Sequence, residues 1–164
     1  MEQKKKEHTL KQERTHIYDD NRIDTYREKE KYKEPTRCSK CSALFINGRW
    51  SWQNTSEETN SAVCPACRRI DDNYPAGFLT LGGSFFDNHR DEIMNMVENI
   101  RTTEREEHPL ERIMNIEEKD GQTVITTTGM HLPRGLGNAI KDAYEGELDI
   151  SYDAENYVRI SWFR

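Results

Sequence analysis

The sequence predicts an α+β protein in which a four-cysteine zinc ribbon precedes a ferredoxin-like βαββαβ domain with an extra C-terminal strand. Two observations lead to this fold class. Two C-x-x-C motifs lie about twenty residues apart with a hairpin signal between them. Beyond them, alternating and helical apolar patterns follow in the order β-α-β-β-α-β-β. The expected divisions are a charged tail over residues 1–34, the ribbon over 35–74 and the α+β domain over 75–164.

Composition narrows the classes of function. Hydrophobic residues make up 34% of the 164 residues and charged residues 33%, so we do not expect the whole chain to fold. No apolar run approaches the roughly 18 residues of a membrane-spanning helix. The net charge of −6 argues against a uniformly basic nucleic-acid binder. However, the charge is +2 over residues 1–37, −3 over 38–100 and −5 over 101–164.

The tail has few aliphatic residues and no periodic pattern. Two interpretations stay open: a solvated segment without fixed structure, or a segment that becomes ordered on a polyanion. In the second case the tail tyrosines would stack on bases, and the phosphate contacts would be Lys4, Lys5, Lys6, Lys11 and Arg14. Because the tail contains no apolar segment of a secretory signal, we expect a cytoplasmic protein.

The two C-x-x-C motifs are Cys38 to Cys41 and Cys64 to Cys67. Each motif turns two sulfurs toward one point, and two such turns complete a tetrahedron around Zn²⁺. Four thiolates around Zn²⁺ leave a negative charge, and the cations placed to offset it are Arg37, Lys40, Arg68 and Arg69. Disulfides need an oxidising compartment, and a redox C-x-x-C needs a βαβ setting. An iron–sulfur cluster remains an alternative to zinc.

The hairpin of the predicted ribbon spans residues 43–52. Asn47-Gly48 predicts a two-residue type I′ turn. The turn sets a register that pairs Ile46 with Arg49, Phe45 with Trp50, and Ala43 with Trp52. One face then carries Ala43, Phe45, Trp50 and Trp52. This face is interpreted as the ribbon's own core or its docking surface onto the next domain, with a stacking platform for bases as the alternative.

The α+β domain begins with a strand over residues 78–81 and a helix that starts after Asp87 as N-cap and ends near Glu107, before Pro109. Strands over 113–117 and 123–128 follow, joined at Asp120-Gly121.

Pro133 suits the first turn of a second helix, which Gly146 ends. Gly135 and Gly137 inside this helix indicate a close backbone approach. Strands over 147–152 and 157–163 complete a ferredoxin-like arrangement, expected as one antiparallel sheet with both helices on one face. This fold by itself does not determine a function.

No catalytic constellation is recognisable. The phosphate-binding G-x-x-x-x-G-K-[ST] motif and the KH-type G-x-x-G motif are absent, and the five histidines show no metal-ligand spacing. If all four cysteines bind metal, no thiol remains as a nucleophile, and a four-thiolate site has no open position for substrate. We therefore expect a protein that is not an enzyme.

From Pro35 onward the chain resembles an uncharacterised bacterial zinc-ribbon family to which the label ATPase is sometimes attached. The residues that carry this resemblance are the two C-x-x-C motifs, Gly48 to Trp50, Tyr74 to Gly77, His108 to Ile113, Thr126 to Thr128 and His131 to Arg134. The paired knuckles followed by an α/β body are also similar to the N-terminal part of the ribosomal large-subunit nuclear export adaptor family. Those adaptors carry more C-x-x-C pairs than the two here. This second resemblance implies ribosome association.

These observations predict a cytoplasmic, non-enzymatic zinc protein that binds the ribosome or structured RNA, for example as an assembly, stress or dormancy factor. A ribosomal protein is a further expected contact. The expected RNA contacts outside the tail are Arg37, Lys40, Arg49, Trp50, Trp52, Arg68, Arg69 and Arg134. The alternative is a zinc-ribbon adaptor between proteins that binds no RNA. The sequence does not indicate an oligomeric state.

Overall fold

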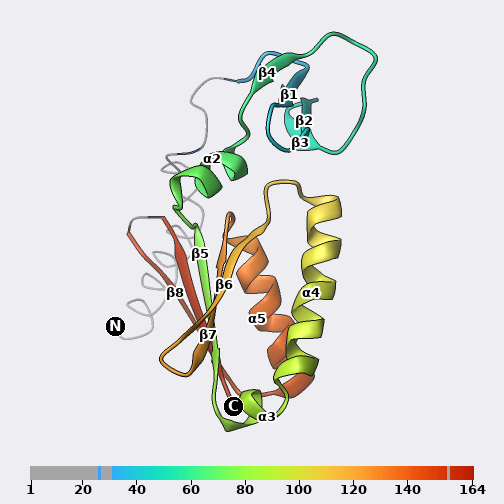
Figure 1. Ribbon diagram of the computed structural model, residues 1–164. Helices are drawn as coiled ribbons and strands as arrows, with labels where there is room; N and C mark the ends of the chain where they lie inside the picture. The colour runs from blue at the N-terminus through green and yellow to red at the C-terminus, as the bar shows by residue number, and fades with distance from the viewer. Residues whose placement is uncertain (1–25, 27–30, 155) are drawn as a thin grey trace, which may run out of the picture.

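The computed structural model describes residue 26 and residues 31–154 and 156–164. It contains a small sheet and a large sheet, connected by helix α2 (Pro65–Asp72). Figure 1 shows the small sheet beyond one end of the large sheet, on the side where α4 and the strand β6 meet. The five predicted phosphate contacts of the tail lie outside the described residues: Lys4, Lys5, Lys6, Lys11 and Arg14.

The small sheet has the strand order β3-β2-β1-β4. Its strands are β1 (Thr36–Cys38), β2 (Leu44–Ile46), β3 (Arg49–Ser51) and β4 (Asn60–Ala62). The β1–β4 pair is parallel and the other two pairs are antiparallel. The sheet is therefore mixed, and β1 and β4 bring the two C-x-x-C segments side by side.

The β2–β3 hairpin forms in the register that the sequence predicts. Asn47 and Gly48 have φ values of 55° and 75°, as a type I′ turn requires. Phe45 pairs with Trp50, and Ile46 pairs with Arg49. The ladder ends before the predicted Ala43–Trp52 pair. Ala43, Phe45, Trp50 and Trp52 nevertheless belong to one apolar cluster, so the interpretation of this face as a core is confirmed.

Contacts with the small sheet begin before Pro35, where the sequence placed the end of the tail. The Tyr32 ring packs against Phe45 and Trp50, with ring centroids 5.1 Å apart in both cases. The Glu34 carboxylate accepts hydrogen bonds from the turn N–H groups of Asn47 and Gly48, each at 2.9 Å.

The large sheet has the strand order β6-β7-β5-β9-β8. Its elements follow the predicted order, with one additional short helix: β5 (Gly77–Gly82), α3 (Ser84–Asn88), α4 (Arg90–Glu107), β6 (Ile113–Lys119), β7 (Gln122–Thr127), α5 (His131–Tyr144), β8 (Glu147–Tyr152) and β9 (Val158–Phe163). Asp87, the predicted N-cap, lies inside α3, and α4 begins after His89.

The large sheet is mixed rather than purely antiparallel, because β9 lies between β5 and β8 and runs parallel to β5. Burial explains why the last strand occupies an inner position. Val158, Ile160 and Trp162 on β9 are at most 2% exposed, whereas most of β8 is exposed. The more apolar strand takes the place covered by helices, and the polar strand becomes the edge.

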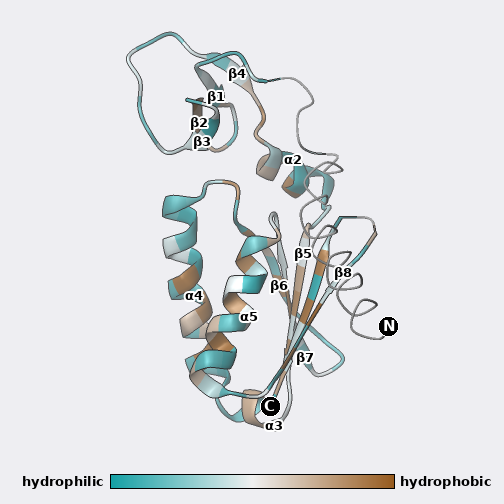
Figure 2. Ribbon diagram, turned by 180° about the vertical axis from the view of Figure 1, so that it is seen from behind, coloured by the Kyte–Doolittle hydropathy of each residue, from teal (hydrophilic) through white to brown (hydrophobic). Residues whose placement is uncertain are grey.

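Helices α4 and α5 lie on the same side of the large sheet, as both views show (Figures 1 and 2). Ile93 and Val97 of α4 and Leu136 of α5 are fully buried in the core formed with β5, β7 and β9. Figure 2 shows hydrophobic colouring on segments of both helices. Among the described residues, none of the helices has the length and apolar character needed to cross a membrane.

The two glycines of α5 provide a matched test of the close approach predicted from the sequence. A Cβ at Gly137 would lie 3.0 Å from Leu148 Cδ1 and 3.1 Å from Ile160 Cγ2, whereas a Cβ at Gly135 would meet nothing within 4 Å. We expect Gly135→Ala to stabilise the protein by up to about 1 kcal/mol, the ordinary helix gain. Gly137→Ala is expected to be about 1–3 kcal/mol less stable than Gly135→Ala because of overpacking. Urea unfolding of both variants measures the difference, and equal stabilities would contradict it.

Candidate metal centre

The four cysteines converge at the junction of the two sheets. Their Sγ atoms all lie within 4.8 Å of one another, and Cys41 Sγ is 3.8 Å from Cys64 Sγ. Zinc bound tetrahedrally at about 2.3 Å would hold its sulfurs about 3.8 Å apart. All four are free thiols, so no disulfide competes with a metal ion. The donor set and its geometry therefore fit a single tetrahedral metal ion.

The first pair is presented by a tight turn after β1. Cys38 N–H donates to the carbonyl of Ala43 at 2.8 Å, and Ser42 N–H donates to the carbonyl of Cys38 at 3.0 Å. Ser42 has a φ of 67°, in the left-handed region, which reverses the chain directly after Cys41. These bonds hold the Cys38 and Cys41 side chains on the same side of the turn.

The second pair is held by the start of α2. Cys64 is the N-cap of this helix, and its sulfur accepts a hydrogen bond from Cys67 N–H at 3.4 Å. Pro65 follows as the first helical residue, where its missing N–H has no cost. The positive end of the helix dipole therefore points at the sulfurs and favours their thiolate form.

Arg112, a residue that the sequence analysis did not select, closes the site. Its side chain is only 9% exposed, and its two terminal nitrogens lie 3.3 Å from Cys64 Sγ, 3.4 Å from Cys41 Sγ and 3.5 Å from Cys67 Sγ. Arg112 Nε donates to the carbonyl of Pro109 at 2.7 Å, and Arg112 N–H donates to Thr128 Oγ1 at 2.9 Å. The guanidinium thus reaches the cluster from the large-sheet side, held in place by its own loop.

Burial and charge show why these sulfurs need a cation. Burial raises the pKa of Cys64 and of Cys67, although contact with the Arg112 guanidinium lowers the pKa of Cys67 in part. Burial also raises the pKa of Cys38. However, backbone N–H groups around its sulfur, that of Cys64 above all, outweigh this effect and lower the pKa to about 6. Arg112 alone cannot balance four thiolates, three of them buried, whereas a divalent ion and Arg112 together offset three of the four negative charges.

The cations predicted to surround the metal have other contacts. Arg37 donates to the carbonyl of Ser42, and Lys40 forms an ion pair with Asp71 at 2.6 Å. Arg68 Nε donates to the carbonyl of Val63 at 3.1 Å. Arg69 is 5% exposed, donates to the Tyr74 carbonyl, and lies over the Tyr26 ring at 4.3 Å.

The remaining predicted RNA contacts occupy different places. Arg49 is exposed at the hairpin, while Trp50 is buried in the small core. Trp52 is partly exposed and its indole N–H donates to the carbonyl of Arg105 at 2.5 Å. Arg134 lies in the first turns of α5, half-buried. Among the described residues, the predicted cations and aromatic rings therefore occupy several separate places.

Sequence reasoning missed Arg112 because it lies far along the chain from the cysteines, in a loop after α4. One signal was available: an arginine in the apolar and proline-containing stretch between His108 and Ile113 is disposed to be buried. A buried arginine needs an anionic partner, and the thiolates are the main buried anions that the sequence predicts.

Glu111, next to Arg112, supplies the start of α5. Its carboxylate accepts a hydrogen bond from Leu132 N–H at 3.0 Å, in place of a side-chain cap from the helix itself. Burial raises the pKa of Glu111 above its ordinary value, against the effect of the Leu132 N–H, which lowers it. A carboxyl whose pKa is raised in the folded state stabilises the fold most at low pH. This stabilisation is lost as the pH rises through the pKa of the carboxyl in the folded protein.

We therefore expect the stability advantage of the wild type over Glu111→Gln to shrink as the pH rises from 5 to 7.5, because only the wild type must ionise a buried carboxyl. Urea unfolding of both proteins across this range measures the difference, and the metal site is common to both. An advantage that grows with pH would mean that the helix N-terminus, rather than burial, controls this group.

Comparison of the chain with family models, with curated proteins and with solved structures finds no match. The resemblances stated from the sequence therefore stay predictions.

Proposed function

We propose that this protein is a non-enzymatic, cytoplasmic zinc protein that associates with the ribosome or with structured RNA, with the four-cysteine cluster as a structural zinc-ribbon centre. The observation that carries the structural role is the closure of the site. Four sulfurs converge, and Arg112 contacts three of them from the loop between α4 and β6. A closed tetrahedral site leaves no position for a substrate or an activated water.

Zinc is the metal that fits this site best. When bound, zinc supplies a rigid tetrahedral link between the two C-x-x-C segments and no redox chemistry. Elemental analysis of the purified protein should give one zinc per chain, and the colourless spectrum of zinc would distinguish it from an iron–sulfur cluster, which absorbs visible light. Four free thiols held for metal also suit a reducing compartment.

Association with RNA is supported by the cations on the surface near the metal centre. Arg49 is exposed at the hairpin, and Arg101 and Arg105 lie on α4 where this helix meets Trp52. The net charge of −6 is thus a sum over the whole chain, and it does not prevent cations from gathering at this junction. The affinity of such cations for phosphates falls as the salt concentration rises.

Sedimentation tests the proposal directly. Tagged protein is run through sucrose gradients with extracts of growing and starved cells, at low and at high salt. We expect co-sedimentation with ribosomal particles at low salt and release as the salt concentration rises. Protein that remains at the top of every gradient would overturn the proposal.

The alternative function, an adaptor between proteins, is favoured by one feature of the large sheet. The edge strand β8 carries two exposed apolar side chains, Ile150 at 36% and Tyr152 at 44% exposure. Such an edge can pair with a strand of another protein. Co-sedimentation that survives nuclease treatment and high salt would favour the adaptor.

A further inference from the structure

The last turns of α4 lie against the small sheet. Trp52, directly after β3, donates its indole N–H to the carbonyl of Arg105 at 2.5 Å. Trp50 and Trp162 are at most 9% exposed, so Trp52 is the tryptophan that remains open to a ligand. The ring is held in place by α4 and lines a surface pocket of about 420 Å³.

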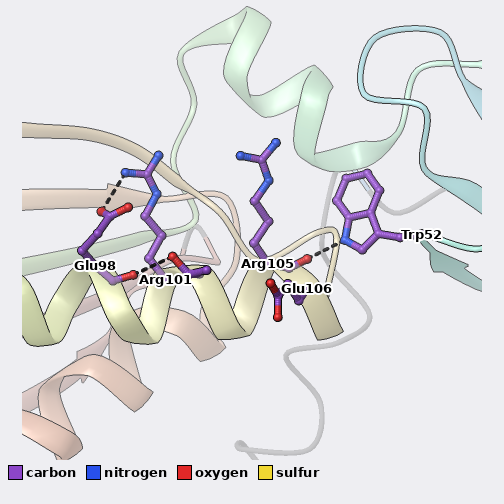
Figure 3. A pocket seen from close by; sticks show the side chains of 6 residues that line it. Trp52, Glu98, Arg101, Arg105 and Glu106 are labelled. Atoms are coloured by element: carbon purple, nitrogen blue, oxygen red, sulfur yellow. Dashed lines mark hydrogen bonds and ion pairs between the residues drawn. The ribbon is translucent and has the colours of Figure 1, made fainter.

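Arg101 and Arg105 line the same pocket, one helical turn apart. Figure 3 shows both guanidinium groups extending from α4 on one side, with the Trp52 ring beyond Arg105. Arg101 forms an ion pair with Glu98 at 3.1 Å. Within the described part of the chain, the Arg105 guanidinium has no hydrogen-bond or ion-pair partner. Arg105 therefore has its full set of donors available.

A second hollow adjoins the first and is lined by the same two arginines. It has a volume of about 170 Å³, and Ile70 of α2, Arg112 and Ile113 complete its wall. The two hollows share Arg101 and Arg105. The surface they line, defined by Trp52, Arg101, Arg105 and Ile70, is called the α4 groove below. It offers a partly open aromatic ring at one end and two guanidinium groups beside it.

We propose that the α4 groove binds a single-stranded RNA segment, with a base stacked on Trp52 and the neighbouring phosphates on Arg105 and Arg101. Aromatic rings bind bases of any sequence by stacking, and guanidinium groups bind phosphate oxygens with paired N–H donors. Two acidic residues of the lining, Glu98 and Glu106, limit the groove to a ligand that places its phosphates at the arginines. This inference rests on the proposed RNA association and locates it on α4, outside the predicted cation set.

The test is the binding of fluorescein-labelled octauridylate to the full-length protein, measured by fluorescence anisotropy over a salt series. The variants are Arg105→Gln, Arg101→Gln and Trp52→Leu. Lys141→Gln is the matched control, because Lys141 is an exposed cation in the last turn of α5, as Arg105 is in that of α4. Thermal unfolding of each variant is recorded, because a cation near a helix C-terminus also stabilises the helix.

We expect Trp52→Leu to weaken binding about 5- to 150-fold, which is the range that corresponds to base–aromatic stacking. Each arginine variant should weaken binding and lower the salt dependence by about one released counterion, whereas Lys141→Gln should leave both unchanged. Equal affinity in all variants would overturn the α4 groove while leaving RNA association intact.

Three further outcomes would overturn the inference. If wild-type protein sediments with ribosomes but does not bind octauridylate at low salt, the RNA association stands and the groove does not bind single strands. If uridine monophosphate competes as well as the octamer at equal nucleotide concentration, the groove is a mononucleotide site. If neither sedimentation nor oligonucleotide binding occurs, the proposed function fails together with the inference.

Discussion

Replacing Cys41 with serine is expected to unfold the small sheet and α2 while the large sheet keeps its structure. Three of the four cysteines are themselves buried members of the small apolar cluster, whose other buried members are Ala43, Phe45, Trp50 and Ala66. A core of this size cannot offset the ordering of its own chain. Binding of zinc contributes about 10–16 kcal/mol in small zinc-dependent domains, so loss of one ligand removes most of the stabilising free energy.

The large sheet should survive because its core is separate. Leu79, Ile93 and Trp162 belong to a cluster built only from residues after β5 begins, and that cluster contains none of the cysteines. Among the described residues, the contacts between the two parts include Arg112 at the sulfurs, Trp52 at α4, and Leu110 against the small cluster. Loss of these contacts separates the parts without opening the larger core.

The three tryptophans make the experiment selective. Trp50 and Trp52 report on the small sheet, and Trp162 reports on the large one, where its indole N–H donates to the Glu145 carbonyl at 2.6 Å. In a ¹H–¹⁵N spectrum of Cys41→Ser, we expect two indole signals to move to unfolded positions and one to stay.

The matched control is Ser39→Ala, an exposed residue between the first two cysteines. It should leave all three indole signals unchanged. Loss of the Trp162 signal in Cys41→Ser would show that the two sheets unfold as one unit. Retention of all three signals would show that the metal is not needed for the fold.

The local features of the fold were predictable because short-range chemistry determines them. Asn47-Gly48 sets the hairpin register through positive φ values that few other pairs adopt. The 147–152 strand and the helix that contains Leu136 and Ile140 also lie where their apolar patterns indicate. The spacing of the C-x-x-C motifs predicted which four side chains converge.

The sheet order and the completion of the site depend on contacts between distant segments. β9 rather than β8 lies next to β5 because β9 is the more apolar of the two strands. Which strand takes this buried position depends on both strands together, so the local pattern of either one does not show it. Likewise, Arg112 meets the sulfurs only because α4 carries the chain back to the small sheet. The predicted cations next to the cysteines in sequence instead bind nearby carbonyl groups and carboxylates.

Replacing Arg112 with methionine is expected to weaken zinc binding about 10- to 100-fold, the range found for residues that contact metal ligands from outside the coordination shell. The guanidinium donates toward three sulfurs from a buried position, so its removal leaves their negative charge without a counter-ion on that side. Methionine replaces the methylene part of the arginine side chain with an apolar chain of similar length, which limits the loss of packing. Competition with a chromophoric chelator at constant pH measures the affinity.

Two further variants separate charge from geometry. Arg112→Lys keeps the charge but not the planar fork that reaches three sulfurs, so an intermediate affinity is expected. Arg37→Met removes a cation next to Cys38 in sequence whose side chain donates to the Ser42 carbonyl, so zinc affinity should change little. If Arg37→Met weakened zinc binding more than Arg112→Met, the cations near the cysteines in sequence would control the metal, and the electrostatic role assigned to Arg112 would be wrong. If Arg112→Met retained wild-type affinity, the guanidinium would serve only to join the two sheets.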